Sequence, residues 1–468
     1  MKKSSYIACA ISAGIVGYLA TVYAVDQGDE TLHKKYLSQT YLVKVDPLSQ
    51  QAFNIFNQNG CQYCHTKNSE MPFYADVPGA KQLMQRDIDH ALRQFNISML
   101  MEQVQHNTPV SQVELAKLES VLNDHAMPPK QFLLMHWRSD LSQQETNTLL
   151  DWVKQERRQY YSDPQVISEY QNDAVQPIST TFKVDQAKVQ LGEALYHDTR
   201  LSGDNTVACS TCHSLTTGGV DNLKTSTGIN GSKGPINAPT VFNSVFNIHQ
   251  FWDGRASDLQ AQAGGPPMNP IEMGAGSWAN IIKKLDKDSA LKAQFDAIYP
   301  QKGISEYSIT NAIAEFEKTL VTPNSRFDKF LKGDKTALTT EEQQGYALFK
   351  KNKCQTCHSG QAMGGLSFEV MGLKDDYFDE RGNMTDVDNG RFNVTKDDND
   401  MHRFKVPTLR NIALTAPYFH DASAKTLEQA VNDMALYQVG VKLNPDEIDK
   451  ITAYLKTLTG EYNGKLLQ

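Results

Sequence analysis

The stretch CSTCH at residues 209–213 decides how this chain is interpreted. Its two cysteines would suit a disulfide, a redox couple or half of a zinc site, but a histidine follows them directly. In a C-x-x-C-H run both thiols add to the vinyl groups of a haem, and the histidine binds the haem iron. Zinc would need a second cluster of ligands to complete its tetrahedron, and a redox couple has no use for the adjacent histidine. The stretch therefore predicts a covalently attached haem c.

The same pattern occurs at two other places, as CQYCH at 61–65 and CQTCH at 354–358. Three short disulfide loops would leave all three histidines unexplained. We therefore predict three covalently bound haem c groups. The attachment cysteines are Cys61, Cys64, Cys209, Cys212, Cys354 and Cys357, and the iron ligands are His65, His213 and His358.

A length of 468 residues corresponds to about three domains of 100–200 residues, which agrees with three motifs at nearly even spacing. The segments GEALYHD (192–198) and GYALFKK (345–351) precede two of the motifs and share a Gly-x-Ala-Leu-aromatic pattern. Amphipathic helices are expected at 145–158 and 444–458. The expected fold class is mostly α, with three cytochrome c-like haem domains with long loops. The predicted boundaries are 1–30 for an N-terminal membrane anchor, then 31–165, 166–335 and 336–468 for the three haem domains.

Two local features refine this division. Thr339 and Glu342 form a predicted capping box at the start of the helix before the third motif. The segments 162–180 and 321–338 are expected to be linkers.

The N-terminus, MKKSSYIACAISAGIVGYLATVYAVDQGDE, has two lysines followed by an uncharged stretch at 4–25. This stretch is long enough to span a bilayer, and the lysines would keep the N-terminal end inside. A signal peptide cleaved after Ala24 is the alternative, although its apolar region usually covers only about 7–15 residues. Because haem c is attached outside the bacterial cytoplasm, we predict a single-pass inner-membrane protein with its haem domains in the periplasm. The net charge of −8 gives no reason to expect nucleic-acid binding.

The sixth iron ligand decides what each haem does. A methionine gives an electron carrier with a raised potential, whereas an open position allows chemistry on a bound ligand. Met434 and Met127 are candidate sixth ligands for the third and first haems, although a methionine is often only core filling. After the second motif no Met or His occurs until His249, so this haem is expected to lack a strong sixth ligand. Glu272, in a Gly- and Pro-rich segment near Gln262, could act as a general acid–base group on a bound peroxide, although a lone glutamate is more often a solvated surface residue.

The segments LGEALYHDTRLS, GPINAPTVFNSVFNIHQFWDGRASDLQAQAGGPPMNPIEM and KVPTLRNIALTAPYFHDAS carry a resemblance to a known family. Together with two haem motifs, they resemble the bacterial dihaem cytochrome c peroxidases from about residue 166 to the C-terminus. The additional N-terminal haem motif and the anchor make the whole chain similar to the three-haem, membrane-anchored branch, the quinol peroxidases.

The resemblance implies roles for individual residues. The domain 166–335 would hold the peroxidatic haem on His213, and 336–468 the electron-transferring haem on His358 and Met434. Glu272 would carry the proton, Gln262 would orient the peroxide, and Trp252 would lie between the two haems. Calcium would bind between the domains at Asn237, Thr415 and Pro417, and the AMPP position of Met127 matches the three-haem branch. One departure is Ile229, which stands where many members have a histidine that occupies the resting peroxidatic iron.

The predicted function is reduction of hydrogen peroxide to water, with electrons from membrane quinol relayed through two further haems. One alternative is the same peroxidase fed by a soluble cytochrome c. Another oxidises a protein substrate through a Tyr-ligated haem, for which Tyr437 lies close enough to Met434. A third is a non-catalytic multihaem electron carrier. A homodimer is one expected assembly.

Overall fold

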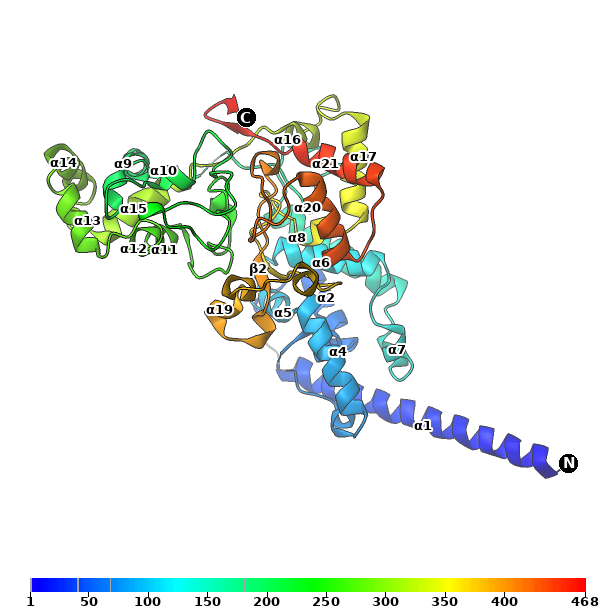
Figure 1. The fold of residues 1–468 in the computed structure, drawn as a ribbon. Coiled ribbons are helices and arrows are strands. Elements are labelled where there is room, and N and C mark those ends of the chain that lie inside the picture. The colour runs from blue at the N-terminus through cyan, green and yellow to red at the C-terminus, as the bar shows by residue number, and fades with distance from the viewer. Residues whose placement is uncertain (1, 40–41, 68, 181) are drawn as a thin grey trace. The chain divides into compact units, whose positions relative to one another are not determined.

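The structure is a computed structural model that describes residues 2–39, 42–67, 69–180 and 182–468. The chain divides into two compact units, Met1–Ser162 and Asp163–Gln468. Both are mostly helical, and the strands of the described residues form two small two-stranded sheets in the second unit (Figure 1). The expected mostly α class with long loops is therefore confirmed. The boundaries expected at 165 and 335 remain predictions.

The first unit packs its helices around one apolar core that reaches the first haem motif. Phe53, Leu100 and Trp152 are fully buried in this core, and Cys61 lies at its edge. The indole N–H of Trp152 donates to Ser49 Oγ at 3.0 Å, which satisfies the one polar atom of that side chain. The helices are α1 (Lys2–Gln39), α2 (Pro47–Gln58), α3 (Cys61–His65), α4 (Ala80–Gln94), α5 (Ser98–Gln105), α6 (Gln112–Asn123), α7 (Lys130–Leu133) and α8 (Gln143–Tyr160).

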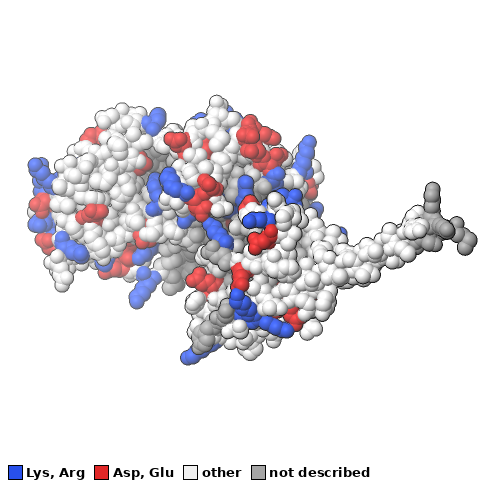
Figure 2. All heavy atoms as spheres, turned by 90° about the horizontal axis from the view of Figure 1, so that it is seen from below, with Lys and Arg blue, Asp and Glu red and all other residues white. Residues whose placement is uncertain are grey.

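Helix α1 has two parts of different character. Within it, Cys9–Ser38 is long and apolar enough to cross a membrane, and in Figure 2 the projecting part of α1 carries no coloured charge on the face in view. The C-terminal part belongs to the core: Tyr36 stacks on Phe53 with ring centres 6.2 Å apart, and the His33 carbonyl accepts from Asn57 Nδ2 at 3.2 Å. One continuous helix therefore joins the uncharged segment to the unit that carries the first motif.

The second unit has two helix pairs that cross closely at glycines. A Cβ at Gly192 of α9 would lie 1.9 Å from the Ala312 carbonyl oxygen on α15, and a Cβ at Gly345 of α17 would lie 2.0 Å from the Lys450 carbonyl oxygen on α21. The shared Gly-x-Ala-Leu-aromatic pattern thus marks two equivalent crossings, at which only glycine fits.

The remaining bounds complete the second unit. The helices are α9 (Gln186–Tyr196), α10 (Cys209–Cys212), α11 (Leu259–Ala263), α12 (Gly265–Met268), α13 (Trp278–Leu285), α14 (Ser289–Ile298), α15 (Glu306–Glu317), α16 (Arg326–Leu331), α17 (Thr340–Lys351), α18 (Tyr377–Arg381), α19 (Phe392–Thr395), α20 (Leu427–Asp433) and α21 (Pro445–Lys456). Strand β1 (Phe368–Val370) pairs antiparallel with β2 (Arg403–Lys405), and β3 (Glu461–Tyr462) with β4 (Lys465–Leu466).

Of the two local predictions, one is confirmed and one is wrong. Thr339 and Glu342 form the expected capping box of α17, with Glu342 Oε2 accepting from the Thr339 N–H at 2.7 Å. The linker prediction for 162–180 and 321–338 is wrong, apart from the unit boundary at Ser162. Val175 and Phe327, one from each segment, are fully buried in the core that surrounds the third haem motif. The polar composition of these segments concealed a few apolar side chains that fix them to that core.

Candidate functional site

The three motif histidines share one hydrogen-bonding arrangement. The Nδ1 atom of His65 lies 2.7 Å from the Phe95 carbonyl, that of His213 lies 3.4 Å from the Gly219 carbonyl, and that of His358 lies 3.1 Å from the Met363 carbonyl. A carbonyl only accepts, so each Nδ1 carries the hydrogen and each Nε2 keeps its lone pair. This is the arrangement of a histidine that ligates a metal through Nε2.

The electrostatics of these rings also suit ligation. Burial lowers the pKa of His358 to about 4 and holds the pKa of His65 and His213 below the usual value. All three rings are therefore neutral at neutral pH, as an iron ligand must be.

The motif cysteines are free thiols, and all six are partly buried. None of the described cysteines is in a disulfide. Each motif begins in a short helical turn: α3 ends at His65, α10 ends at Cys212 directly before His213, and the turn Cys354–Thr356 ends directly before Cys357 and His358. Two thiols and an imidazole nitrogen with a free lone pair at each motif fit covalent haem attachment.

Glu272 is held in place in the second unit. Its Oε1 accepts from Asn269 Nδ2 at 2.8 Å, and its backbone carbonyl accepts from the Ile229 N–H at 2.9 Å. Burial raises the pKa of Glu272 above the usual range, against the opposing effects of Arg255 and the Asn269 hydrogen bond. A half-buried carboxyl with a raised pKa is better suited than a solvated one to hold a proton and pass it on.

The Gly-rich loop around Ile229 packs directly on the Glu272 backbone. A Cβ at Gly228 would lie 2.1 Å from the Ile271 carbonyl oxygen, so this close approach requires glycine. The Ile229 side chain is buried in an apolar cluster with Met273 and Ala275. It supplies an apolar anchor for the loop at the position where the resemblance places a ligand.

Gln262 lies at the C-terminal end of α11 and is half-buried. Its side-chain amide makes no hydrogen bond with the described part of the chain, so it is available to a ligand.

Trp252 lies at the junction of the segments 166–335 and 336–468, inside the second unit. Its indole N–H donates to the Asn237 carbonyl at 2.9 Å, and its ring meets His420 edge-on at 6.3 Å between centres. The Lys405 N–H donates to the Trp252 carbonyl at 2.8 Å. The indole is therefore fixed from both segments.

The three residues expected to hold calcium lie on neighbouring loops. The Asn237 N–H donates to the His420 carbonyl, and Asn222 Nδ2 donates to the Leu414 and Ala416 carbonyls. Within the described chain, the amide oxygen of Asn237 and the carbonyl oxygens of Thr415 and Pro417 accept no hydrogen bond. Uncommitted amide and carbonyl oxygens are ligands that calcium prefers, so this donor set fits the ion.

Met434 is the first residue of a π-helical turn, Met434–Val439, that follows α20. Such turns often mark functional positions, and α20 packs on the core that also contains Cys354 and Met363. Tyr437, the alternative ligand, donates its hydroxyl to Glu380 Oε2 at 2.6 Å. Met127 follows α6 on a loop and is 37% exposed.

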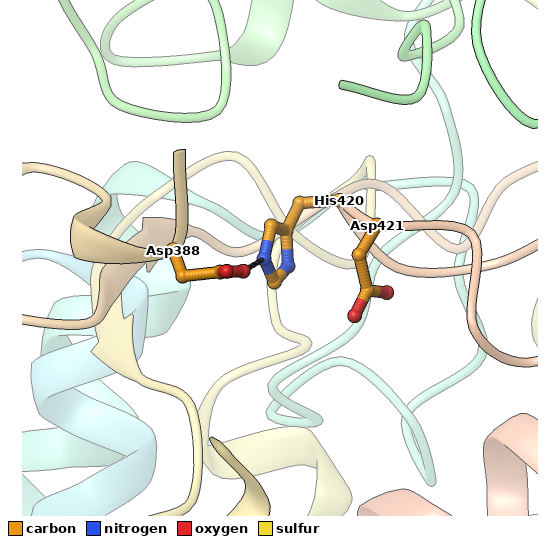
Figure 3. A group of neighbouring side chains, drawn as sticks. All are labelled: Asp388, His420 and Asp421. Atoms are coloured by element: carbon orange, nitrogen blue, oxygen red, sulfur yellow. Dashed lines mark hydrogen bonds and ion pairs between the residues drawn. The ribbon is translucent and has the colours of Figure 1, made fainter. Parts of the chain in front are cut away.

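The sequence reasoning missed a charged cluster beside Trp252. His420 Nε2 donates to Asp388 at 2.7 Å, as Figure 3 shows, and Asp421 lies next to the ring on the other side. Arg381 donates to both carboxylates, at 2.8 Å to Asp388 and 2.5 Å to Asp421. Burial alone would raise the pKa of Asp388, but the hydrogen bonds from Arg381 and His420 hold it well below the usual range.

Asp388, His420 and Asp421 bring ligand atoms together as a metal site would. Arg381 already supplies the cation between the two carboxylates, so the group is a buried ion-pair cluster. The only sequence signal was the His-Asp pair in PYFHDAS, which does not indicate Arg381 or Asp388.

Comparisons with known proteins agree with this geometry. A model of the di-haem cytochrome c peroxidases matches residues 186–336, a haem-binding domain model matches 17–155, and a cytochrome c model matches 342–459. The chain is 51% identical over 412 residues to the cytochrome c peroxidase Ccp of Escherichia coli (strain K12), covering 88% of each chain. It is 41% identical to the cytochrome c551 peroxidase of Pseudomonas aeruginosa, covering 59% of this chain and 80% of that one.

Solved structures show the same fold over part of the chain. A MauG-like protein associated with microbial copper homeostasis superposes with a TM-score of 0.54 at 31% identity, covering 61% of this chain and 93% of the other. The diheme peroxidase BthA of Burkholderia thailandensis E264 superposes with a TM-score of 0.50 at 18% identity, covering 61% and 89%, which is likeness of fold alone.

The motif turns and the matching models define a c-type haem protein. The chain belongs to the di-haem cytochrome c peroxidase family, and it is a haem peroxidase. Its substrate class is accordingly hydrogen peroxide, and this excludes the non-catalytic electron carrier among the alternatives.

Proposed function

We propose that the chain reduces hydrogen peroxide at the haem held by His213, with electrons from membrane quinol. The electrons pass through the haems attached at 61–65 and 354–358. The observation that carries the choice of donor is the continuity of α1, which joins the uncharged segment 4–25 to the core around the first motif. A donor dissolved in the membrane would thus meet the first haem unit where that unit is attached.

A haem held by His213 would supply the redox-active iron for this reaction. Glu272 moves the proton from the inner to the outer peroxide oxygen, because its raised pKa lets it accept and return a proton. Asn269 and the Ile229 N–H hold Glu272 in position. The free amide of Gln262 orients the peroxide.

Trp252, fixed by Asn237 and His420, assists electron passage between the second and third haems. Met434 would bind the iron of the haem attached at 354–358, and Met127 that of the haem attached at 61–65. Calcium at Asn237, Thr415 and Pro417 stabilises the loop junction that also carries Trp252. We further propose a total of three haem c groups, which predicts a holoprotein mass of the processed chain plus three haems.

A soluble cytochrome c is the competing donor, and it is favoured by the names of the relatives, cytochrome c peroxidase and cytochrome c551 peroxidase. The decisive experiment measures peroxide consumption by the detergent-purified holoenzyme with a short-chain ubiquinol as the sole donor. Sustained turnover supports the proposal. Turnover that requires added cytochrome c would contradict quinol as the donor and leave peroxide reduction intact.

A further inference from the structure

A second set of buried ionisable groups lies in the first unit, far along the chain from Glu272. Tyr74 Oη is 2.8 Å from Asp29 Oδ1 and 2.8 Å from His136 Nε2. Asp29 and His136 are both at least nine-tenths buried. We call these three side chains the proton chain.

The hydrogen bonds of the proton chain are one hydrogen short, so the chain can accept one additional proton. His136 Nδ1 lies 2.9 Å from the Phe132 carbonyl, which only accepts, so this nitrogen carries a hydrogen. With Asp29 ionised and His136 neutral, the single Tyr74 hydroxyl hydrogen would have to serve two acceptors. One further proton, on Asp29 or on His136 Nε2, completes both bonds.

The proton chain lies beside the first haem motif. His33 is four residues after Asp29 on α1, and its ring stacks on Tyr63 of the CQYCH motif with centres 5.7 Å apart. Tyr63 is 2% exposed, and its hydroxyl has no hydrogen-bond partner, nor has the buried Nε2 of His33. Two buried polar atoms without partners indicate a polar ligand at this point.

The proton chain also lies where the uncharged segment of α1 joins the first unit. Asp29 follows the end of the uncharged stretch at Val25 by about one turn of α1. Around it, Phe73, Leu134 and Trp137 expose 62%, 61% and 51% of their surface. The Tyr18 hydroxyl of α1 donates to the Leu134 carbonyl, so this apolar rim borders the membrane-spanning part of the helix.

We propose that the proton chain is the proton-accepting side of a quinol-oxidation site, a step that rests on the proposed function above. The ligand is a hydroquinone with a lipid-soluble tail. Its tail stays with the bilayer at the apolar rim, and its ring hydroxyls reach Asp29, His33 and Tyr63. None of these residues is part of the peroxide site.

The reaction balances with the reduction of peroxide. A quinol gives up two protons and two electrons and becomes a quinone. The electrons pass one at a time to the haem attached at 61–65. Asp29 accepts the first proton through the incomplete hydrogen-bond chain, and the chain accepts the second after releasing the first to solvent. Peroxide takes up two protons and two electrons and gives two water molecules.

The test compares Asp29→Asn and Tyr74→Phe with Glu30→Gln in the full-length holoenzyme. Both test variants keep the side-chain shape but remove the proton acceptor or the link, whereas Glu30 lies next in sequence on α1 and pairs with Lys34 and Arg138 outside the proton chain. Reduction of the haems by a short-chain ubiquinol is followed by stopped flow without peroxide. We expect its rate to fall by about 10²-fold or more in both test variants, the scale for losing a positioned acid–base group, and to be unchanged in Glu30→Gln.

Two further measurements separate this role from a structural one. Reduction by ascorbate with a mediator should keep its wild-type rate in both test variants, and binding of oxidised short-chain ubiquinone, measured by calorimetry, should weaken. Variants that are slow with both donors would mean that the residues only support the haem, and this would overturn the proposal. Variants that react with ubiquinol as the wild type does would also overturn it.

The two proposals fail in different ways. If the wild-type enzyme is not reduced by ubiquinol at all, quinol is not the donor and the site has no substrate. If the wild type is reduced and the variants are equally fast, quinol remains the donor but is oxidised elsewhere.

Discussion

Glu272 combines a raised pKa with two fixed contacts, and this makes it the most informative single residue of the peroxide site. Glu272→Gln keeps its size and its hydrogen bond from Asn269 but cannot carry a proton. We expect peroxide turnover to fall by about 10²–10⁴-fold, with haem content unchanged. The matched control is Glu193→Gln, because Glu193 on α9 is a solvent-exposed carboxylate of the same predicted domain.

Glu272 is also expected to determine how peroxide turnover depends on pH. Because burial raises the pKa of Glu272, the carboxyl group stays protonated to a higher pH than a solvated glutamate does. Activity that requires the ionised form should therefore be lost as the pH falls through this raised pKa, above the usual glutamate range. The acidic limb of kcat/KM for peroxide should be absent in Glu272→Gln, and an unchanged limb would assign it to another group.

We expect Ile229 to determine the resting state of the proposed peroxide site. An isoleucine cannot bind iron, and here its side chain is buried with Met273 and Ala275. We expect the untreated oxidised enzyme to show a high-spin ferric signal and to react with peroxide without prior reduction. Electron paramagnetic resonance and a peroxide assay without reductant check this. A purely low-spin spectrum together with no reaction would mean that another residue closes the site.

Met434 and Tyr437 can be distinguished by substitution. Met434→His should lower the midpoint potential of one haem, because a second imidazole donates more strongly to iron than a thioether does. Tyr437→Phe should leave all potentials unchanged, since its hydroxyl is bound to Glu380. A redox titration with the reverse result would make Tyr437 the ligand.

At the residue scale, the predictions depend on chemistry that is local in sequence. The attachment cysteines and the histidines follow from five consecutive letters. The carbonyls that orient those histidines lie 5 to 30 residues away and carry no side-chain signal. Arg381 and Asp388 were missed for the same reason, because only the folding of long loops brings them to His420.

At the scale of elements, the helix before each motif is set by what it packs against. The repeated Gly-x-Ala-Leu-aromatic pattern was visible in the sequence, but its cause is the close crossing of α9 with α15 and of α17 with α21. The linker prediction failed because short loops and α16 (Arg326–Leu331) bury only a few apolar side chains, too few to produce a periodic pattern.

Gly345→Ala tests the crossing directly. The added methyl group would lie 2.0 Å from the Lys450 carbonyl oxygen, so α17 and α21 must move apart. We expect a loss of about 1–3 kcal/mol in the free energy of unfolding, the usual range for overpacking. Gln344→Ala, at the exposed neighbouring position on α17, should change stability by no more than about 0.5 kcal/mol. Equal unfolding midpoints for the two variants, measured in denaturant, would contradict the crossing.

At the scale of the whole molecule, the chain combines a segment of membrane-spanning length with units that carry covalent haem motifs. Helix α1 is part of both the apolar segment and the first unit. Its first part is exposed and apolar, while Tyr36 and His33 pack in the first unit. The sequence predicted the anchor from the uncharged stretch alone. The sequence did not indicate that the helix continues to Gln39. The charged residues after Val25 mark the end of the apolar segment, but they do not show where the helix ends.

Removing residues 1–20, with a foreign signal peptide supplied, separates the two roles of α1. The deletion leaves only five uncharged residues before Asp26, too few to cross a bilayer, and it keeps the buried Val22 and Val25. We expect a soluble protein with a full complement of haem and normal peroxide turnover with artificial donors. Activity in quinol-containing membranes should fall, because the first unit is no longer held at the bilayer surface. A matched deletion of residues 1–39 should lose the first haem unit, since it removes the Tyr36 stacking on Phe53. If the native protein is already soluble and begins at Val25, the segment is a signal peptide, and the quinol donor must then reach the enzyme without an anchor.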